Sequence, residues 1–468
     1  MSVSKNRKKS GSARKPNIIL ITIDALRYDH LGFMGYGKDT SPFLDGLSKK
    51  ALWFRHAFSV SAGSLQSFIG IMTSTYPLDY GGYSRITEKR TLLSEALQNG
   101  GYQTMGFHSN PYLSSYFGYE RGWDCFRYLN YFSDSKRGAG TRSGTWQFKI
   151  VNAILNFRRW LLRHAPIVDS VVGIFERSAS TIRKMYLDFT NPIQAYFTAF
   201  EVNTVVMKEL PKKPKKPFFL WVHYMDAHAP YGLFLRQSRA KLGRSRRIIR
   251  KIQSYCSDYL FDFWSEYPNI NRFFSSLYLD MYDEGIRHID AAMEKLFVHL
   301  STIGVLNDES AVFITVDHGE EFGEHGGFQH MEKAFNTNVR VPLVVVAPEK
   351  LCGKPGVREI PRGLLDIAPT ILDFAGVKRP KNFRGQNLFD VGERDVIVEL
   401  SENDADFSGI RPLGRAIVAK GHKLIKDQSG TFLFSLADED EQSNVYRENR
   451  EMALQLEKRL ENFRSIKA

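Results

Sequence analysis

Cysteine is scarce in this sequence, and its three copies, Cys125, Cys256 and Cys352, are widely spaced and odd in number. This pattern argues against a disulfide framework and against a cysteine-based zinc site, and it favours a reducing cytoplasm. No apolar run approaches the roughly 18 residues needed to span a bilayer. Residues 1–15 lack an apolar core and so do not fit a secretory signal. We expect a cytoplasmic protein that begins with a disordered basic tail over 1–15.

Acidic residues are outnumbered by basic ones, and the formal net charge of +13 is unevenly placed. Basic residues concentrate in the tail, in 208–216 and in 236–251. No base-stacking or groove-reading module accompanies these runs, so we predict no specific nucleic-acid partner. The apolar fraction of 43% and aromatic fraction of 13% argue against global disorder. The 468 residues suffice for one large domain and a smaller one.

Strongly apolar segments alternate with helical ones along most of the chain. Runs that are apolar on both faces suit strands buried inside a parallel sheet, and helices between them suit its two faces. The alternation predicts an α/β fold with a mostly parallel central sheet. The predicted strands are 17–24, 103–108, 218–224, 311–317 and 339–347, and the predicted helices are 41–51, 64–73, 91–101 and 281–300.

Two regions interrupt the alternation of strands and helices, and the C-terminal part of the chain has a different residue pattern. Residues 130–215 and 235–275 are predicted to be basic, helical insertions. After the main domain come short strands and turns, followed by a charged helix over 448–463. We predict a main α/β domain over 16–378 that contains both insertions, and a smaller C-terminal α+β subdomain over 379–468.

Two aspartates, Asp24 and Asp317, close predicted strands, and His318 follows the second at once. Ligands of open α/β sheets bind just beyond the carboxyl ends of the strands. Two carboxylates and an imidazole at that edge are the beginnings of a metal site. The imidazole favours Mn²⁺, Zn²⁺ or Mg²⁺ over the all-oxygen cage that Ca²⁺ prefers, without excluding any of them. The alternative is that these residues only cap loops or helices.

With the motifs around these residues, the chain resembles the sulfatase family of the alkaline phosphatase superfamily. The resemblance implies an alkaline-phosphatase-like three-layer sandwich and a metal-dependent hydrolase of sulfate, phosphate or phosphonate esters. It also implies one divalent cation, with Ca²⁺, Mg²⁺ or Mn²⁺ as the candidates. The matching stretches are 17–35, which contains Ile-Asp-Ala-Leu-Arg-Tyr-Asp-His-Leu-Gly, together with 61–77, 101–126, 218–231, 282–300, 317–348 and 366–376.

The resemblance assigns the nucleophile to Ser64, at the start of the predicted helix 64–73. It assigns the metal ligands to Asp24, Ser64, Asp317 and His318. A hydroxyl at a helix N-terminus and against a dication can ionise near neutral pH, because both stabilise the alkoxide. The residue alone leaves another interpretation open, in which Ser64 merely caps the helix.

Three departures from the family pattern bear on the chemistry. Sulfatases that form formylglycine carry Cys or Ser, any residue, Pro, any residue, Arg, whereas this chain has Gln66 and Phe68 in place of Pro and Arg. We therefore expect Ser64 to remain unmodified. The anion-binding Lys-Trp-His stretch is replaced at 108–111. The usual second aspartate is Ala25, which favours a single metal, the alternative being a second metal completed by a residue from elsewhere in the chain. These differences shift the prediction toward relatives that use a serine or threonine on phosphate or phosphonate esters.

Histidines supply the proton that a leaving group needs near neutral pH. The resemblance points to His228 and His330 as catalytic residues, and the alternative for each is a loop histidine that bonds a carbonyl. Asn110, Arg27 and His223 are the candidates for substrate binding. His223 lies within a predicted strand, so a core histidine is the competing interpretation for it.

The first predicted insertion contains an amphipathic stretch over 146–163 with an aromatic and aliphatic face and a basic flank. Such a stretch suits a lipid-like substrate or a peripheral contact with an anionic membrane, and the alternative is a helix packed on the core. We expect a small-molecule or lipid-like ester as substrate. The runner-up functions are a phosphoryl head-group transferase and a catalytically reduced sulfatase-like protein that binds a membrane or a partner.

Overall fold

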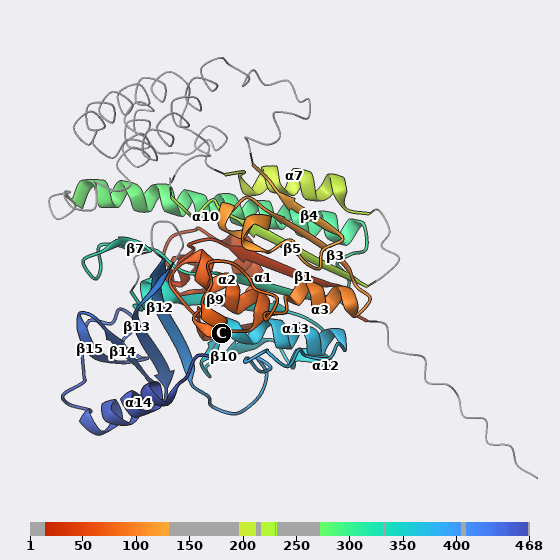
Figure 1. Cartoon of the computed structure of the whole chain (residues 1–468). Helices are drawn as coiled ribbons and strands as arrows, with labels where there is room; N and C mark the ends of the chain where they lie inside the picture. Colours follow the sequence, from red (N-terminus) through yellow and green to blue (C-terminus); the bar gives the residue numbers. More distant parts are fainter. Residues whose placement is uncertain are drawn as a thin grey trace, which may run out of the picture.

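A computed structural model describes residues 15–130, 196–211, 217–229, 231, 272–330, 333–403 and 409–466. Within these ranges, nine strands form the main sheet in the order β10-β2-β9-β6-β1-β5-β3-β4, with β11 beside β2. Figure 1 labels several of them, including the central strands β1 and β5. Their bounds are β1 (Ile18–Ile23), β2 (Leu52–Phe58), β3 (Gln103–His108), β4 (Cys125–Tyr128), β5 (Phe218–Tyr224), β6 (Ala311–Val316), β9 (Arg340–Val346), β10 (Gly356–Arg358) and β11 (Arg362–Gly363).

Strand β1 lies inside the sheet and pairs in parallel with β5 on one side and β6 on the other. All residues of these three strands are buried, because helices cover both faces of the sheet. β9 runs antiparallel to both β2 and β6. The sheet is therefore mixed but mostly parallel, and the predicted fold class is confirmed.

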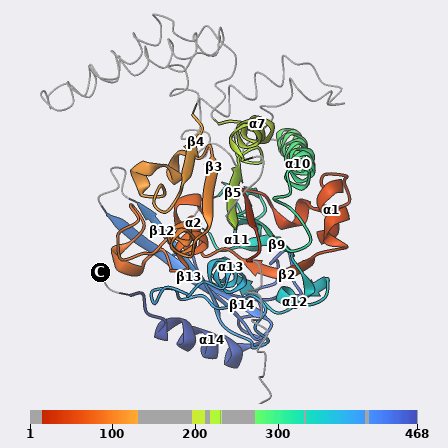
Figure 2. The same cartoon turned by 90° about the vertical axis from the view of Figure 1, so that its right-hand side faces the viewer.

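Helices form a layer on each face of the sheet, which gives three layers in all (Figure 2). α1, α7 and α10 pack together on one face, and α2, α3 and α13 pack together on the other. α10 begins inside the range predicted as the second insertion and is longer than the predicted helix 281–300. The helices are α1 (Pro42–Ser48), α2 (Ser64–Thr73), α3 (Leu93–Asn99), α7 (Ala199–Glu209), α10 (Arg272–Thr302), α11 (Asn336–Val339), α12 (Glu349–Cys352) and α13 (Ile367–Ala375).

A four-stranded antiparallel sheet follows, in the order β12-β13-β14-β15, with the helix α14 packed on it (Figure 1). This C-terminal sheet contacts the main domain just before α2, where Glu399 N donates to Val60 O (2.8 Å) and Ser61 Oγ donates to Glu399 O (2.7 Å). The bounds of these elements are β12 (Val396–Asn403), β13 (Ile410–Ala419), β14 (His422–Asp427), β15 (Gly430–Ser435) and α14 (Arg450–Asn462).

Much of the predicted insertions falls outside the described residues, including the amphipathic stretch 146–163, and so does the basic tail through residue 14. The exceptions are α7, which lies within 130–215, and the start of α10. In the part of the chain that the structure describes, each helix is either too short or too polar to cross a bilayer.

A buried ion pair holds the C-terminal sheet to the segment that leads into β9. Lys423 of β14 lies 2.5 Å from Glu441, and its Nζ also donates to Ala334 O and Asn336 Oδ1, each at 2.8 Å. Both charged side chains are 1% exposed. Because burial opposes the charged form of each group, it lowers the pKa of Lys423 and raises that of Glu441.

We expect Lys423→Met to lower the free energy of unfolding by about 3–5 kcal/mol, because it leaves a buried carboxylate without its cation. The matched control is Lys426→Met on the same strand. Lys426 pairs with Glu461 at 3.0 Å, but the two side chains are 44% and 63% exposed. An exposed pair contributes about 0–1 kcal/mol. Urea unfolding of both variants tests this, and equal losses would contradict it.

Candidate metal centre and active site

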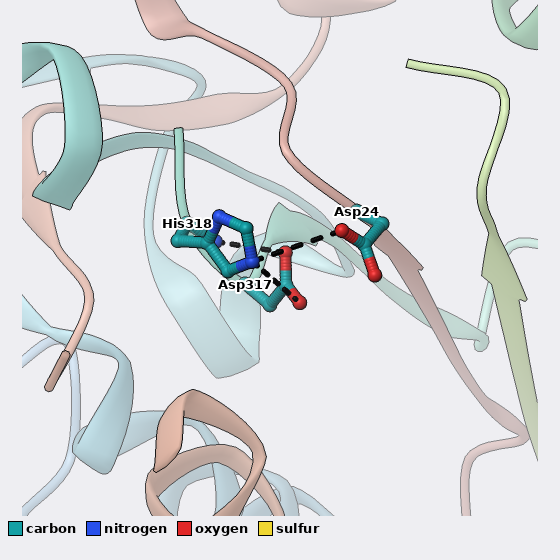
Figure 3. Close-up of side chains that lie close together, drawn as sticks. All are labelled: Asp24, Asp317 and His318. Carbon is teal, nitrogen blue, oxygen red and sulfur yellow. Dashed lines mark hydrogen bonds and ion pairs between the residues drawn. The ribbon is translucent and has the colours of Figure 1, made fainter. Parts of the chain in front are cut away.

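Asp24, Asp317 and His318 meet at the carboxyl ends of β1 and β6. The two strands are paired in register, Ile23 opposite Val316, so the residues that follow them are level with each other. Each of the three side chains offers one ligand atom within 4.8 Å of the other two, and all three are buried (Figure 3). We call these three residues the strand-end cluster.

The ligand atoms of the strand-end cluster face one another. His318 Nε2 lies 3.7 Å from Asp24 Oδ1 and 3.6 Å from Asp317 Oδ2. His318 Nδ1 donates to Gly319 O at 2.9 Å, so Nε2 presents its lone pair to the carboxylates. Among the described residues, neither Asp24 Oδ1 nor Asp317 Oδ2 has a hydrogen-bond partner. Two buried carboxylate oxygens and an imidazole nitrogen that converge in this way fit a divalent cation.

The electrostatics of the strand-end cluster agree with that fit. Burial, and then the charge of Asp24, raise the pKa of Asp317 above its usual range. Burial lowers the pKa of His318 to about 3, which keeps its imidazole neutral and able to ligate. A dication would offset the repulsion between the two carboxylates.

Ser64 is the first residue of α2, and its hydroxyl points into the strand-end cluster. Ser64 Oγ donates to Asp24 Oδ2 at 3.1 Å and lies 3.2 Å from His318 Nε2. The residue that caps α2 is Gly63, in an extended conformation, so Ser64 does not serve as the cap. The serine is 7% exposed, at the positive end of the helix dipole.

The two positions that depart from the formylglycine pattern are filled by structural contacts. Gln66 Nε2 donates to Tyr83 Oη at 3.0 Å and to Ser401 O, in β12, at 3.1 Å. Phe68 is fully buried and meets the ring of His223 edge-on, with centroids 5.0 Å apart. These side chains tie α2 to the C-terminal sheet and to the core.

We expect the purified protein to carry an unmodified serine at position 64. Formylglycine is lighter than serine by two hydrogen atoms, so mass spectrometry of the tryptic peptide 56–85 separates the two. Detection of the lighter peptide would contradict this expectation.

Asn110 and His223 both contact the second oxygen of Asp24. Asn110 Nδ2 donates to Asp24 Oδ2 at 2.8 Å, and its Oδ1 accepts from Tyr112 N at 2.9 Å, which fixes the orientation of the amide. His223 Nε2 lies 3.3 Å from the same oxygen, and Nδ1 lies 3.0 Å from Thr22 Oγ1. His223 is therefore both a buried strand residue and a partner of the strand-end cluster.

His228 and His330 lie on the accessible side of the strand-end cluster, each with its side chain 26% exposed. Their ring centroids are 5.2 Å apart, and the ring of His330 is 4.5 Å from that of His318. His228 Nε2 is 4.0 Å from Asp24 Oδ1. The structure thus brings both predicted proton donors to the site.

Arg27 is not brought into the strand-end cluster. Its guanidinium forms ion pairs with Asp29 and Glu324, and Nη1 donates to Glu320 O at 3.3 Å. The positive charge is thus already balanced by two carboxylates, which does not favour the predicted role in substrate binding. The sequence could have indicated one of these ion pairs, because Asp29 is only two residues from Arg27.

Sequence reasoning missed Glu320 and Tyr231. Glu320 is fully buried beside the strand-end cluster, and its Oε2 accepts from Tyr231 Oη at 2.7 Å. The dense acidic run from Asp317 to His325 marked the region, but nothing in the run distinguishes Glu320 from Glu321.

The strand order, the helices on both faces of the sheet, and a hydroxyl beside two carboxylates and an imidazole place the candidate site at the strand ends, where ligands of open α/β sheets bind. The family model described as Sulfatase matches residues 16–377, and the chain belongs to the sulfatase family. A second model, described as N-sulphoglucosamine sulphohydrolase, C-terminal, matches residues 323–465.

Several characterised proteins resemble the chain over nearly its whole length. An arylsulfatase of Clostridium perfringens is 23% identical, over 94% of this chain and 89% of its own. An ulvan-active sulfatase of Formosa agariphila is 24% identical, over 92% of this chain and 77% of its own. The phosphonate monoester hydrolase of Agrobacterium radiobacter shares the fold, with a TM-score of 0.63 at 18% identity, over 96% of this chain and 94% of its own.

Proposed function

We propose that this protein is a metal-dependent hydrolase of sulfate, phosphate or phosphonate esters that uses unmodified Ser64 as its nucleophile. One observation carries the proposal: Ser64 Oγ, at the N-terminus of α2, lies within 3.2 Å of both Asp24 and His318. Asp24 and His318, together with Asp317, each offer one ligand atom for a cation. A hydroxyl in this place is positioned to lose its proton and attack.

Asp24, Asp317, His318 and Ser64 would hold the cation. When bound, a divalent cation lowers the pKa of a coordinated hydroxyl and offsets the charge of the transferred group. Two carboxylates, an imidazole and a hydroxyl suit Mn²⁺, Zn²⁺ or Mg²⁺ better than Ca²⁺. Ala25 supplies no carboxylate, so we expect one cation per chain.

Nucleophilic attack and proton transfer are carried out by side chains of the protein. Ser64 Oγ attacks the sulfur or phosphorus centre in line, and the bond from that centre to the leaving oxygen breaks. His228 or His330 gives that oxygen a proton. Water then hydrolyses the ester on Ser64, and the same imidazole takes up the proton of the water. Asn110 and His223 hold Asp24 in place through their contacts with Oδ2.

The residues around Ser64 favour a phosphorus ester over a sulfate. Gln66 and Phe68 stand where the formylglycine pattern requires Pro and Arg, and both have structural roles. The family resemblance implies relatives that use a serine or threonine on phosphate or phosphonate esters, and an unmodified Ser64 matches that group. The full-length resemblance to a sulfatase keeps sulfate esters among the candidates.

A substrate panel tests the proposal. Protein loaded in turn with Mn²⁺, Zn²⁺, Mg²⁺ and Ca²⁺ is assayed on an aryl sulfate, a phosphate monoester, a phosphodiester and a phosphonate monoester. We expect turnover only with a cation, and faster turnover of at least one phosphorus ester than of the sulfate. Transfer to an added alcohol in preference to water would favour a head-group transferase. No bound metal and no turnover would reject the proposal in favour of a binding protein.

A further inference from the structure

Glu320 is a buried carboxylate that lies beside the strand-end cluster without belonging to it. It is 0% exposed, and both of its carboxylate oxygens are directed toward named partners. Oε2 accepts from Tyr231 Oη at 2.7 Å, and Oε1 lies 3.2 Å from His330 Nδ1. Its backbone is fixed as well, because Glu320 N donates to Thr337 O at 2.9 Å. The carboxylate therefore has a defined position before any substrate arrives.

The chain delivers His330 to this carboxylate through a conformation that is unusual for its sequence. Gln329, the last residue of the short strand β8 (Phe328–Gln329), has a φ of 61°. A residue other than glycine adopts such a φ only where its surroundings enforce it, and such residues gather at functional sites. β8 pairs with β7 (Glu321–Phe322), so the hairpin that begins just after Glu320 returns the chain to it at His330.

The two candidate proton donors are held differently. His228 Nδ1 contacts a backbone carbonyl, that of Ala229, at 2.5 Å. His330 Nδ1 contacts a carboxylate that is itself held by a tyrosine. A carboxylate on one nitrogen of an imidazole fixes the tautomer, orients the ring and stabilises the protonated ring during transfer.

We propose that Glu320 is a positioning residue for His330, and that the pair makes His330, not His228, the proton donor to the leaving group. With Nδ1–H directed at Glu320, Nε2 is the nitrogen that meets the ester oxygen. Tyr231 keeps Glu320 in the orientation that this requires. The inference rests on the proposed function, because it chooses between the two donors that the function requires.

The test compares esters of one acid with two leaving groups, a nitrophenol and a simple alkanol, on the metal-loaded protein. A nitrophenolate leaves with little need for a proton, whereas an alkoxide needs one. We expect His330→Ala and Glu320→Gln each to lower kcat/KM about 10–100-fold on the alkyl ester, and much less on the nitrophenyl ester. Equal losses on the two esters would overturn the proposal.

The matched control is Glu321→Gln. Glu321 is the next residue, equally buried, and its Oε1 accepts from His325 N and Gly327 N, each at 2.8 Å, on the same hairpin. Damage to the hairpin alone would affect the two esters alike. Tyr231→Phe, which removes only one hydroxyl, is a milder second variant. We expect it, like Glu320→Gln, to lower kcat/KM more on the alkyl ester than on the nitrophenyl ester, but by a smaller factor.

A double variant and a spectroscopic measurement complete the test. If Glu320 acts through His330, adding Glu320→Gln to His330→Ala has no further effect on either ester. Nitrogen-15 NMR of the Zn²⁺- or Mg²⁺-loaded protein should show His330 protonated at Nδ1 and altered by Glu320→Gln. Additive losses, or an unchanged His330 signal, would overturn the proposal. If Ser64→Ala retains turnover, the proposed function itself fails, which is a separate outcome.

Discussion

Replacing Ser64 with alanine is expected to lower kcat by about 10³-fold or more, equivalent to roughly 4 kcal/mol of activation free energy. The change removes only Oγ, the atom that contacts Asp24 and His318. No other hydroxyl of the described residues makes a hydrogen bond to both of these side chains, so none replaces it. Steady-state kinetics on the best substrate of the panel measures the loss.

Ser67→Ala is the matched control for that measurement. Ser67 lies one turn further along α2, is fully buried, and bonds to Ser59 Oγ (2.8 Å) and Ser61 O (3.0 Å), away from the strand-end cluster. We expect kcat to change less than about threefold, with some loss of stability from the broken hydrogen bonds. Equal loss of kcat in the two variants would show that α2 matters only for packing, and would contradict the role of Ser64.

Replacing Asp317 with asparagine is expected to weaken cation binding by at least about 100-fold, roughly 2.7 kcal/mol, and to stabilise the metal-free protein. The amide oxygen can still accept from Ala25 N and His318 N, which bond to Oδ1 in the structure. What is lost is a carboxyl group that can ionise to hold a cation, and in the metal-free protein burial and the charge of Asp24 oppose that ionisation and raise its pKa. Metal titration by calorimetry, and thermal melting with and without cation, measure the two effects.

The sign of the pH effect follows from the same charge. A carboxyl with a raised pKa in the folded state stays protonated there at pH values where the unfolded chain has lost the proton. Asp317 therefore makes the metal-free protein less stable as pH rises from about 4 through the raised pKa. We expect Asp317→Asn to flatten that part of the stability profile.

Asp366→Asn is the control carboxylate for these measurements. Asp366 is also buried, but its partner is Arg394, at 2.8 Å, and it is not a member of the strand-end cluster. Its loss should lower stability with and without cation and leave metal affinity unchanged. If Asp317→Asn behaves in the same way, Asp317 is a structural residue and the metal site is wrong.

Much of the fold was predictable because its central strands are apolar on both faces. Apolar runs such as 311–317 indicate strands that are buried between layers of helices. Asp24 and Asp317 follow two such strands and therefore lie at the same edge of the sheet. The antiparallel direction of β9 was not predictable, since a buried strand reads the same in either direction. The position of Ser64 followed from family resemblance, because a serine that begins a helix is most often only a cap.

Contacts between distant residues account for what the sequence did not predict. Tyr231 and Glu320 are 89 positions apart, and no pattern along the chain links them. Arg27 was a candidate for substrate binding, and the sequence did not predict its ion pairs with Asp29 and Glu324. The type of a residue indicates which chemistry its side chain can perform. Which residues pair with each other depends on how the loops fold, and the sequence does not show that.

Trapping the enzyme-bound ester tests the central claim most directly. The metal-loaded protein is quenched in acid during turnover of the best substrate, digested with trypsin, and the peptide 56–85 is sequenced by tandem mass spectrometry. We predict a sulfuryl or phosphoryl group on the Oγ of an unmodified Ser64, and none in Ser64→Ala. A formylglycine at position 64, or a modified group on another residue of an active enzyme, would contradict the account.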